Sequence, residues 1–167
     1  IGLYNAKGDY TGNNVKDTNI RVASDYNGKP VTKIGSCAFY GGTGTSVTIP
    51  DSVTSIGDEA FGYSSYTSIV IGNGVKSIGN WVFSGCANLK SVTIGSGLTY
   101  LGYRPFFDCW NLTTINYKGT KAQWKAINKN WAEAHVSGQQ ALPCNTPEFT
   151  VSCSDGNLSK KEACKSK

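Results

Sequence analysis

The chain has 167 residues and a formal net charge of +5, and charged residues make up 16% of it. This length suits one compact unit, and the sequence contains no apolar run near the roughly 18 residues that are needed to cross a bilayer. The composition therefore argues against several large domains and against a transmembrane segment.

The N-terminal stretch, residues 1–19, is polar and rich in Gly, Asn and Asp. The chain begins at Ile1 and contains no methionine, so we expect a processed form or an excised fragment from which any export signal is missing. We predict that residues 1–19 are the remainder of a cap over the array described next, because the exposed end of such an array needs a cover.

Residues 46–113 repeat one segment three times. The copies start at residues 46, 68 and 91, which are 22 and then 23 residues apart. Self-similarity at a period of about 20 to 50 residues is typical of a solenoid, in which each coil contacts only its neighbours. Such a chain builds a long surface more readily than a deep reactive pocket, which favours a binding protein over an enzyme.

Each copy keeps apolar residues at the same positions. Matching positions of successive coils stack at about 4.8 Å, so these columns predict a continuous apolar interior. A glycine column, Gly57, Gly79 and Gly102, indicates a corner that needs a positive φ, and the segment after it is predicted to form a single helical turn. The apolar columns are Val47, Ile69 and Val92; Ile49, Ile71 and Ile94; Val53, Val75 and Leu98; Ile56, Ile78 and Leu101; and Phe61, Phe83 and Phe106.

The same pattern extends beyond the three clear copies. Residues 31–39 match the second half of a unit, and Ile20 and Val22 supply its strand if residues 26–30 are a looped insertion. On the other side, Ile115 and Tyr117 occupy the strand positions of a further unit. We therefore expect an array of about four to five coils over residues 20–117.

Three strings carry a resemblance to a known family: YNGKPVTKIGSCAF at 26–39, IPDSVTSIGDEAF at 49–61 and VKSIGNWVFSGCANLKSVTI at 75–94. They resemble the BspA-like leucine-rich repeat family, whose units carry an Ile-Gly-x-x-Ala-Phe core. The resemblance implies a right-handed, β-rich solenoid of short strands with one-turn helical arcs. It also implies a secreted or cell-surface protein that binds host proteins, matrix or cells and is not an enzyme.

The C-terminal region, residues 118–167, is expected to cap the array. Thr120 and Gln123 form the pattern of a capping box, which predicts a helix over about residues 121–134. Trp124, Ile127 and Trp131 would share one face of this helix and cover the last coil. We further expect a strand at about 149–153, followed by a polar tail.

Two surfaces are candidates for partner binding. Strand alternation places one residue of each first strand outward, and this row is interpreted either as a solubilising face or as a flat surface for a protein partner. The row is Arg21, Thr48, Val70, Thr93 and Asn116.

A second candidate surface is aromatic. Several Tyr and Trp residues depart from the repeat core, and such residues are common anchors of protein and sugar contacts. Trp81, Tyr100 and Tyr103 are the preferred candidates, although some of the set are expected to pack between coils. The set is Tyr63, Tyr66, Trp81, Tyr100, Tyr103 and Trp110.

The six cysteines allow more than one interpretation. Cys86 and Cys109 are equivalent in adjacent coils, where they would either bridge or form a buried thiol column. Cys144 and Cys153 are the preferred disulfide pair in an oxidising compartment. The sequence contains no CxxC motif and no Cys/His cluster at zinc spacing, so no structural metal and no cofactor is predicted.

Basic residues are concentrated near the C-terminus. They are interpreted either as a patch that binds acidic polymers or as a solvated surface. No base-reading pattern accompanies them, so we do not expect a nucleic-acid partner. His135 is the only histidine, and Asp58 and Glu59 lie on a repeat turn, so neither indicates a catalytic site. The basic residues are Lys118, Lys121, Lys125, Lys129, Lys160, Lys161, Lys165 and Lys167.

Two functional hypotheses follow. The leading one is an extracellular or cell-surface protein-interaction module of adhesin type without catalytic activity. The alternative is a carbohydrate or cell-wall binding module of a larger surface protein. Aromatic residues that line one groove would favour the sugar hypothesis, and a patchwork of Thr, Ser, Lys and Asn would favour a protein partner.

Overall fold

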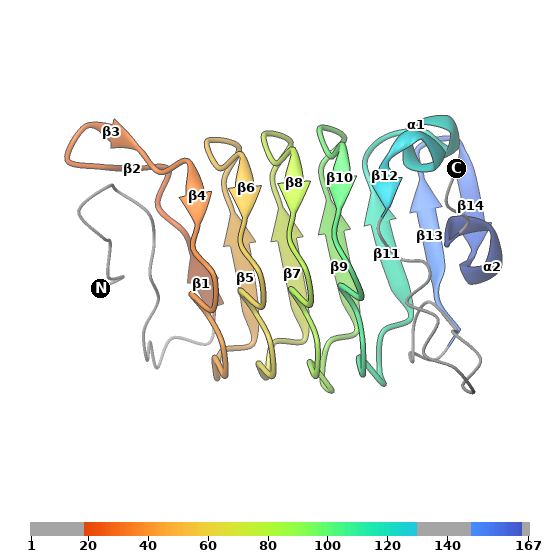
Figure 1. Cartoon of the computed structure of the whole chain (residues 1–167), viewed down its shortest axis with the longest axis horizontal. Coiled ribbons are helices and arrows are strands. Elements are labelled where there is room, and N and C mark those ends of the chain that lie inside the picture. Colours follow the sequence, from red (N-terminus) through yellow and green to blue (C-terminus); the bar gives the residue numbers. More distant parts are fainter. Residues whose placement is uncertain (1–18, 130–147, 165–167) are drawn as a thin grey trace.

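The structure of the chain is a computed structural model that describes residues 19–129 and 148–164. It confirms the predicted solenoid: strands from successive coils lie side by side along the long axis of the molecule (Figure 1). Two sheets run along this axis and enclose the apolar interior between them. The cap was expected over residues 1–19, of which Asn19 begins β1 and residues 1–18 lie outside the described residues, as do Trp131, His135 and Cys144.

The larger sheet contains seven strands among the described residues, in the order β1-β5-β7-β9-β11-β13-β14. All neighbours pair in parallel except β13 and β14, which form an antiparallel hairpin at the C-terminal edge. Parallel pairing follows from the repeat, because each coil returns the chain to the same sheet in the same direction. The strands are β1 (Asn19–Arg21), β5 (Ser46–Ile49), β7 (Ser68–Ile71), β9 (Ser91–Ile94), β11 (Thr114–Tyr117), β13 (Thr150–Cys153) and β14 (Gly156–Ser159).

The smaller sheet contains five two-residue strands within the described part of the chain, all parallel, in the order β12-β10-β8-β6-β4. The insertion expected at residues 26–30 is a hairpin of β2 (Asp25–Tyr26) and β3 (Lys29–Pro30). The strands of the smaller sheet are β4 (Lys33–Ile34), β6 (Ser55–Ile56), β8 (Ser77–Ile78), β10 (Tyr100–Leu101) and β12 (Asn128–Lys129).

The register confirms the predicted columns. Val47 pairs with Ile69, which in turn pairs with Val92, and all three are at most 1% exposed. The phenylalanine rings stack along the axis, with centroid distances of 4.9, 5.7 and 5.2 Å and interplanar angles of at most 16°. These rings belong to Phe39, Phe61, Phe83 and Phe106.

The arcs, residues 35–42, 57–64, 79–86 and 102–109, are hydrogen-bonded turns and not the one-turn helices that were expected. Each arc carries a non-glycine residue in the left-handed region, for example Glu59 at φ 53° and Trp81 at φ 55°. A right-handed helix cannot contain that conformation. The amides instead bond between coils: Glu59, Phe61 and Tyr63 donate to the carbonyls of the next arc at 2.7–2.9 Å.

The glycine column has a different cause from the one predicted. Gly57, Gly79 and Gly102 are not among the residues with positive φ. A Cβ on Gly102 would lie 2.3 Å from the carbonyl oxygen of Gly79, and one on Gly57 would lie 2.6 Å from the amide nitrogen of Ser36. Glycine is required because adjacent backbones approach closely at this corner.

The first C-terminal helix, α1 (Lys121–Ala126), is shorter than predicted. Its capping box is present as expected, with Thr120 accepting from the Gln123 amide at 3.2 Å. The helix ends at Ala126 because the following residues form β12 and pair with β10. It therefore lies within a coil, between β11 and β12, and the prediction that it covers the end of the array is not confirmed (Figure 1).

The C-terminal edge is formed by β13, β14 and a second helix, α2 (Lys160–Ala163). Of these, β14 and α2 lie in the stretch that was predicted to be a polar tail. Two apolar residues anchor this stretch, since Leu158 is 2% exposed and Ala163 is fully buried. The Trp124 indole donates to the Ala163 carbonyl at 3.1 Å, which joins α1 to α2. The predicted strand at 149–153 is β13, which begins one residue later.

Candidate functional site

The predicted outward row is one continuous ladder on the larger sheet. Cross-strand pairs join Arg21 to Thr48, Thr48 to Val70, Val70 to Thr93 and Thr93 to Asn116. Arg21 and Val70 are exposed, and the other three are half-buried. The structure therefore brings these five residues together on one face, which is polar except at the exposed Val70.

A parallel row of hydroxyl residues, not singled out from the sequence, accompanies this ladder. Its members pair in register, and all are half-buried. Short Ser and Thr side chains lose little conformational entropy when a partner orders them. The second row is Ser46, Ser68, Ser91, Thr114 and Thr150.

Tyr100 does not belong to either row. It lies on β10 of the smaller sheet, paired with Ser77 on one side and Asn128 on the other. The structure thus separates Tyr100 from Trp81 and Tyr103, which lie on the arcs. The three aromatic candidates do not form one site.

The arcs carry a column of projecting side chains at one repeat position. Cys37, Glu59, Trp81 and Arg104 occupy this position in successive arcs, and all four have φ between 44° and 56°. The backbone amides of Cys37, Glu59 and Trp81 each donate to a carbonyl of the next arc. The acceptor is the residue that precedes the next member of the column, as for the Trp81 amide and the Tyr103 carbonyl at 2.8 Å. A non-glycine residue in this region is uncommon, and four in one column indicate a position at which side chains are retained despite a backbone cost.

Aromatic rings cluster around this column. The Trp81 ring meets Tyr103 at 5.3 Å and Phe107 at 5.4 Å, both edge to face. The Arg104 guanidinium carbon lies 5.1–5.4 Å from the centroids of all three rings. Cation–π attraction therefore holds Arg104 against the cluster.

Next to this cluster lies a groove of about 230 Å³, called here the aromatic groove. It crosses three successive arcs, and no single motif contains its residues. The Tyr63 ring packs over Gly85, where a Cβ would lie 2.7 Å from it. The groove is lined by Glu59, Gly62, Tyr63, Trp81, Ser84 and Phe107.

Two polar groups of the groove are not engaged by the rest of the described chain. Ser84 is only 5% exposed, and its hydroxyl has no hydrogen-bond partner among residues 19–129 and 148–164. The Glu59 carboxylate is exposed and, within the same residues, has no ion-pair partner. Among the described residues, the buried side-chain polar atom that lacks a partner is Ser52 Oγ; the Ser84 hydroxyl instead is open to the groove, where it can bond to water or to a ligand.

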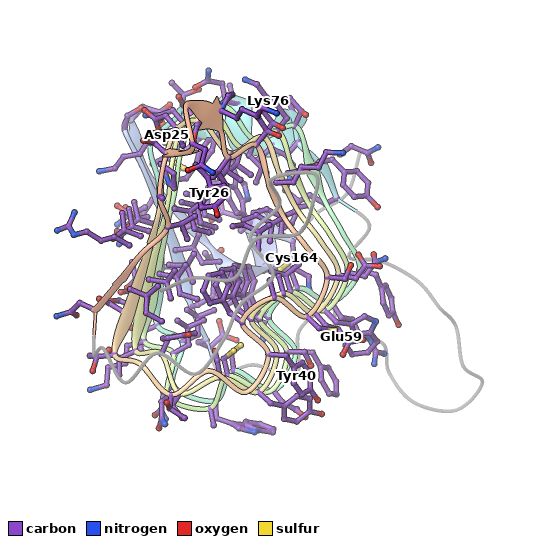
Figure 2. All side chains as sticks on the ribbon, turned by 90° about the vertical axis from the view of Figure 1, so that its left-hand side faces the viewer. Asp25, Tyr26, Tyr40, Glu59, Lys76 and Cys164 are labelled. Atoms are coloured by element: carbon purple, nitrogen blue, oxygen red, sulfur yellow. The ribbon has the colours of Figure 1, made fainter. Side chains whose placement is uncertain are left out.

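The aromatic surface continues toward the N-terminal end. Tyr40 contacts Tyr63 at a ring distance of 5.5 Å, and both rings are exposed, at 49% and 61%. Loss of hydration raises the pKa of the Tyr40 phenol, and the neighbouring groups of Tyr63 and Glu59 raise it further. Figure 2 shows Tyr40 and Glu59 at the same corner of the coil cross-section, pointing away from the apolar interior.

Sequence reasoning identified Trp81 and Tyr103 but missed Glu59, Ser84 and Phe107. A usable signal was present, since the position of Glu59 and Trp81 changes its residue type in every coil while the position two residues later, that of Phe61 and Phe83, keeps its phenylalanine. The other aromatic candidates differ in exposure. Tyr66 is 1% exposed and packs against Phe61, whereas Trp110 is 55% exposed and lies outside the groove.

Comparison with known proteins agrees with this repeat architecture. The model of the BspA type leucine-rich repeat region matches residues 17–130 in six copies. The chain belongs to this family. A search of curated proteins found no match.

Two solved structures are similar to this BspA-type chain. The leucine-rich repeat protein TpLRR of T. pallidum is 23% identical, with a TM-score of 0.60 over 75% of this chain and 64% of that one. The pneumococcal vaccine antigen PcpA is 20% identical, with a TM-score of 0.53 over 92% of this chain and 42% of that one. The chain thus spans less than two thirds of the length of both proteins, and the similarity shows the fold.

The repeat cysteines of this BspA-type array form a thiol column without a bridge. Cys86 donates to the Phe61 carbonyl and Cys109 to the Phe83 carbonyl, each at 2.9 Å. Contact with the Cys109 thiol lowers the pKa of Cys86, and burial opposes this shift. Cys144 lies outside the described residues, so its disulfide with Cys153 stays a prediction.

The C-terminal basic residues of the BspA-type chain are not one surface patch. Lys129 is 6% exposed, and its ammonium donates to the carbonyls of Trp124 and Ile127 and lies 5.5 Å from the Trp124 ring centroid. It therefore stabilises the end of α1, whereas Lys118 and Lys125 are exposed. Within the described residues, no three His, Cys, Asp or Glu side chains come together as metal ligands, and no helix is long and apolar enough to span a membrane.

Proposed function

We propose that this chain is an extracellular or cell-surface protein-interaction module of adhesin type, without catalytic activity, whose partner is a host or matrix protein. Family membership supports a surface or interaction role at the coarse level. The supporting observation is the polar ladder on the larger sheet, in which Thr48, Val70 and Thr93 are direct neighbours. A flat, rigid face of this kind presents one side chain per coil at intervals of about 4.8 Å, with hydrogen-bonding groups on either side of the apolar Val70.

Binding to a panel of purified matrix proteins tests this proposal, with the double variant Val70→Lys, Thr93→Lys as the probe. Two lysines in the centre of the ladder would add bulk and charge, and we expect at least about tenfold weaker binding, because central contacts dominate interface energies. The double variant Ser55→Lys, Ser77→Lys is the matched control, since it places the same two charges on paired residues of β6 and β8 in the smaller sheet. Equal effects of both variants would contradict binding by the ladder.

The proposed absence of catalysis has its own test. Hydrolytic turnover of protein or glycan substrates by the isolated chain, lost on His135→Ala, would contradict it. The chain has one histidine, so any His-dependent mechanism would have to use His135. We expect no such turnover.

A carbohydrate or cell-wall binding module of a larger surface protein is the second candidate. The observation that favours it is the aromatic groove, which combines ring surfaces with unengaged polar groups. Both functions are compatible with one molecule, because the groove lies on the arcs and the ladder on the larger sheet.

A further inference from the structure

The aromatic groove has the composition of a small-molecule site. Ligand pockets are concave, mostly apolar, and carry a few polar groups that fix orientation. Here Tyr63, Trp81 and Phe107 supply ring surface, while Ser84 and Glu59 supply the polar groups. At about 230 Å³ the groove is smaller than the roughly 300–1,000 Å³ of sites for drug-sized ligands, so it suits a single ring unit.

The Ser84 hydroxyl points to a ligand that can hydrogen-bond. Its backbone is fully engaged, with the amide donating to Trp81 at 3.0 Å and the carbonyl accepting from Tyr63 at 2.7 Å. The hydroxyl makes no hydrogen bond to the described chain and is open to the groove, so it is available to a ligand. A ligand hydroxyl in the groove would satisfy it, whereas an apolar ligand would bury it without a partner.

The charges around the groove select a neutral ligand. Arg104 already lies over the rings of Trp81 and Phe107, so a second cation would be repelled from the cation–π position. An anion that entered the groove would meet the Glu59 carboxylate, which is part of its lining. Within the described residues, neither Glu59 nor Arg104 has an ion-pair partner, so both can bond to neutral hydroxyl groups.

From these observations, we propose that the aromatic groove binds one neutral hexopyranose ring with equatorial hydroxyls. Equatorial hydroxyls leave such a ring with flat C–H faces, which pack on Trp81 and Tyr63, while its edge hydroxyls bond to Ser84 and Glu59. The inference rests on the second candidate function and is independent of the protein-binding ladder.

NMR titration of the intact, ¹⁵N-labelled chain tests the proposal. The probes are the β-1,4-linked tetramers of glucose and of N-acetylglucosamine. We expect saturable shifts of the Gly62 and Ser84 amides and of the Trp81 indole. Trp81→Ala should weaken binding by at least about tenfold, since a central aromatic anchor is removed, and Trp110→Ala, an exposed tryptophan outside the groove, should leave it unchanged.

Ser84→Ala separates a binding role from a structural one. Because the hydroxyl makes no hydrogen bond to the described chain, we expect its removal to leave thermal stability unchanged and to weaken binding by about fivefold. Loss of stability with unchanged binding would contradict the proposal. A proline-rich or lysine-rich peptide that shifts the same signals, when neither tetramer does so at about 10 mM, would overturn it.

Two outcomes separate this proposal from the leading function. If a matrix protein binds the ladder and neither tetramer shifts the groove, the sugar site is wrong and the protein-binding function stands. If a tetramer binds the groove and the double variant Val70→Lys, Thr93→Lys retains that binding, the sugar site is supported whether or not a protein partner is found.

Discussion

The inner and outer residues of the same arcs differ in how much their residue type varies from coil to coil. On the inside, Phe61 and Phe83 stack at 5.7 Å and the position never changes between clear copies. Two residues earlier in the chain, on the outside, the corresponding position holds Glu59, Trp81 and Arg104. Stacked coils require equal bulk where columns touch, whereas the outer column touches solvent and can vary. Recognition in this fold is therefore expected on the outer positions that differ from coil to coil.

The largest effect should come from the inner column. Phe83→Ala removes a fully buried ring that is stacked on two others, so we expect the free energy of unfolding to fall by about 3–5 kcal/mol. Urea denaturation measures the change. The control is Tyr63→Ala on the outer surface, where 61% exposure predicts a loss below about 1 kcal/mol. Similar losses for both variants would break the contrast between inside and outside.

The corner glycines should give the next largest effect. Gly102→Ala places a Cβ against the Gly79 carbonyl, which requires two coils to separate locally. We expect a loss of about 1–3 kcal/mol by urea denaturation. Ser77→Ala, on the outward side of β8, should stay within about 0.5 kcal/mol of the parent. A neutral Gly102→Ala variant would show that this corner tolerates a wider coil spacing.

Alkaline pH should lower the free energy of unfolding through Tyr117, in the C-terminal part of the interior. Burial raises the pKa of Tyr117 above its ordinary value of about 10, with a smaller contribution from Cys153. The fold therefore favours the neutral phenol. The contribution of Tyr117 to stability is complete below its unfolded-state pKa and is lost as the pH rises through its folded-state pKa. Urea unfolding at about pH 8 and about pH 11 should show this loss in the parent and a smaller loss in Tyr117→Phe. An equal loss in both proteins would assign the effect to other groups.

The smallest effect should be a gain in stability from a substitution in the outer column. Glu59 has φ 53° and no ion-pair partner among the described residues, and Asn adopts this region at lower cost. We expect Glu59→Asn to stabilise the protein by about 0.5 kcal/mol in urea denaturation while it weakens the proposed sugar binding. A stability loss would show that Glu59 is retained for packing and not for recognition.

The repeat columns and the register could be predicted because they depend on periodicity alone. The capping box of Thr120 and Gln123 was likewise visible, since its contacts are local. The end of α1 was not predictable from the helical spacing of Trp124 and Ile127, because pairing between β12 and β10 competes for the following residues. The β14 and α2 elements were missed because Leu158 and Ala163 are isolated apolar residues in a polar stretch.

Sequence by itself determined which residues stack and in what register, because a period of 22 to 23 residues with matched bulk allows one arrangement of coils. Only the tertiary structure decided which side chains share a surface. Glu59, Tyr63, Trp81, Ser84 and Phe107 come from three coils and meet because adjacent arcs are joined amide to carbonyl. No local pattern encodes that meeting, since it depends on the left-handed turns and close backbone contacts that the stacked coils impose.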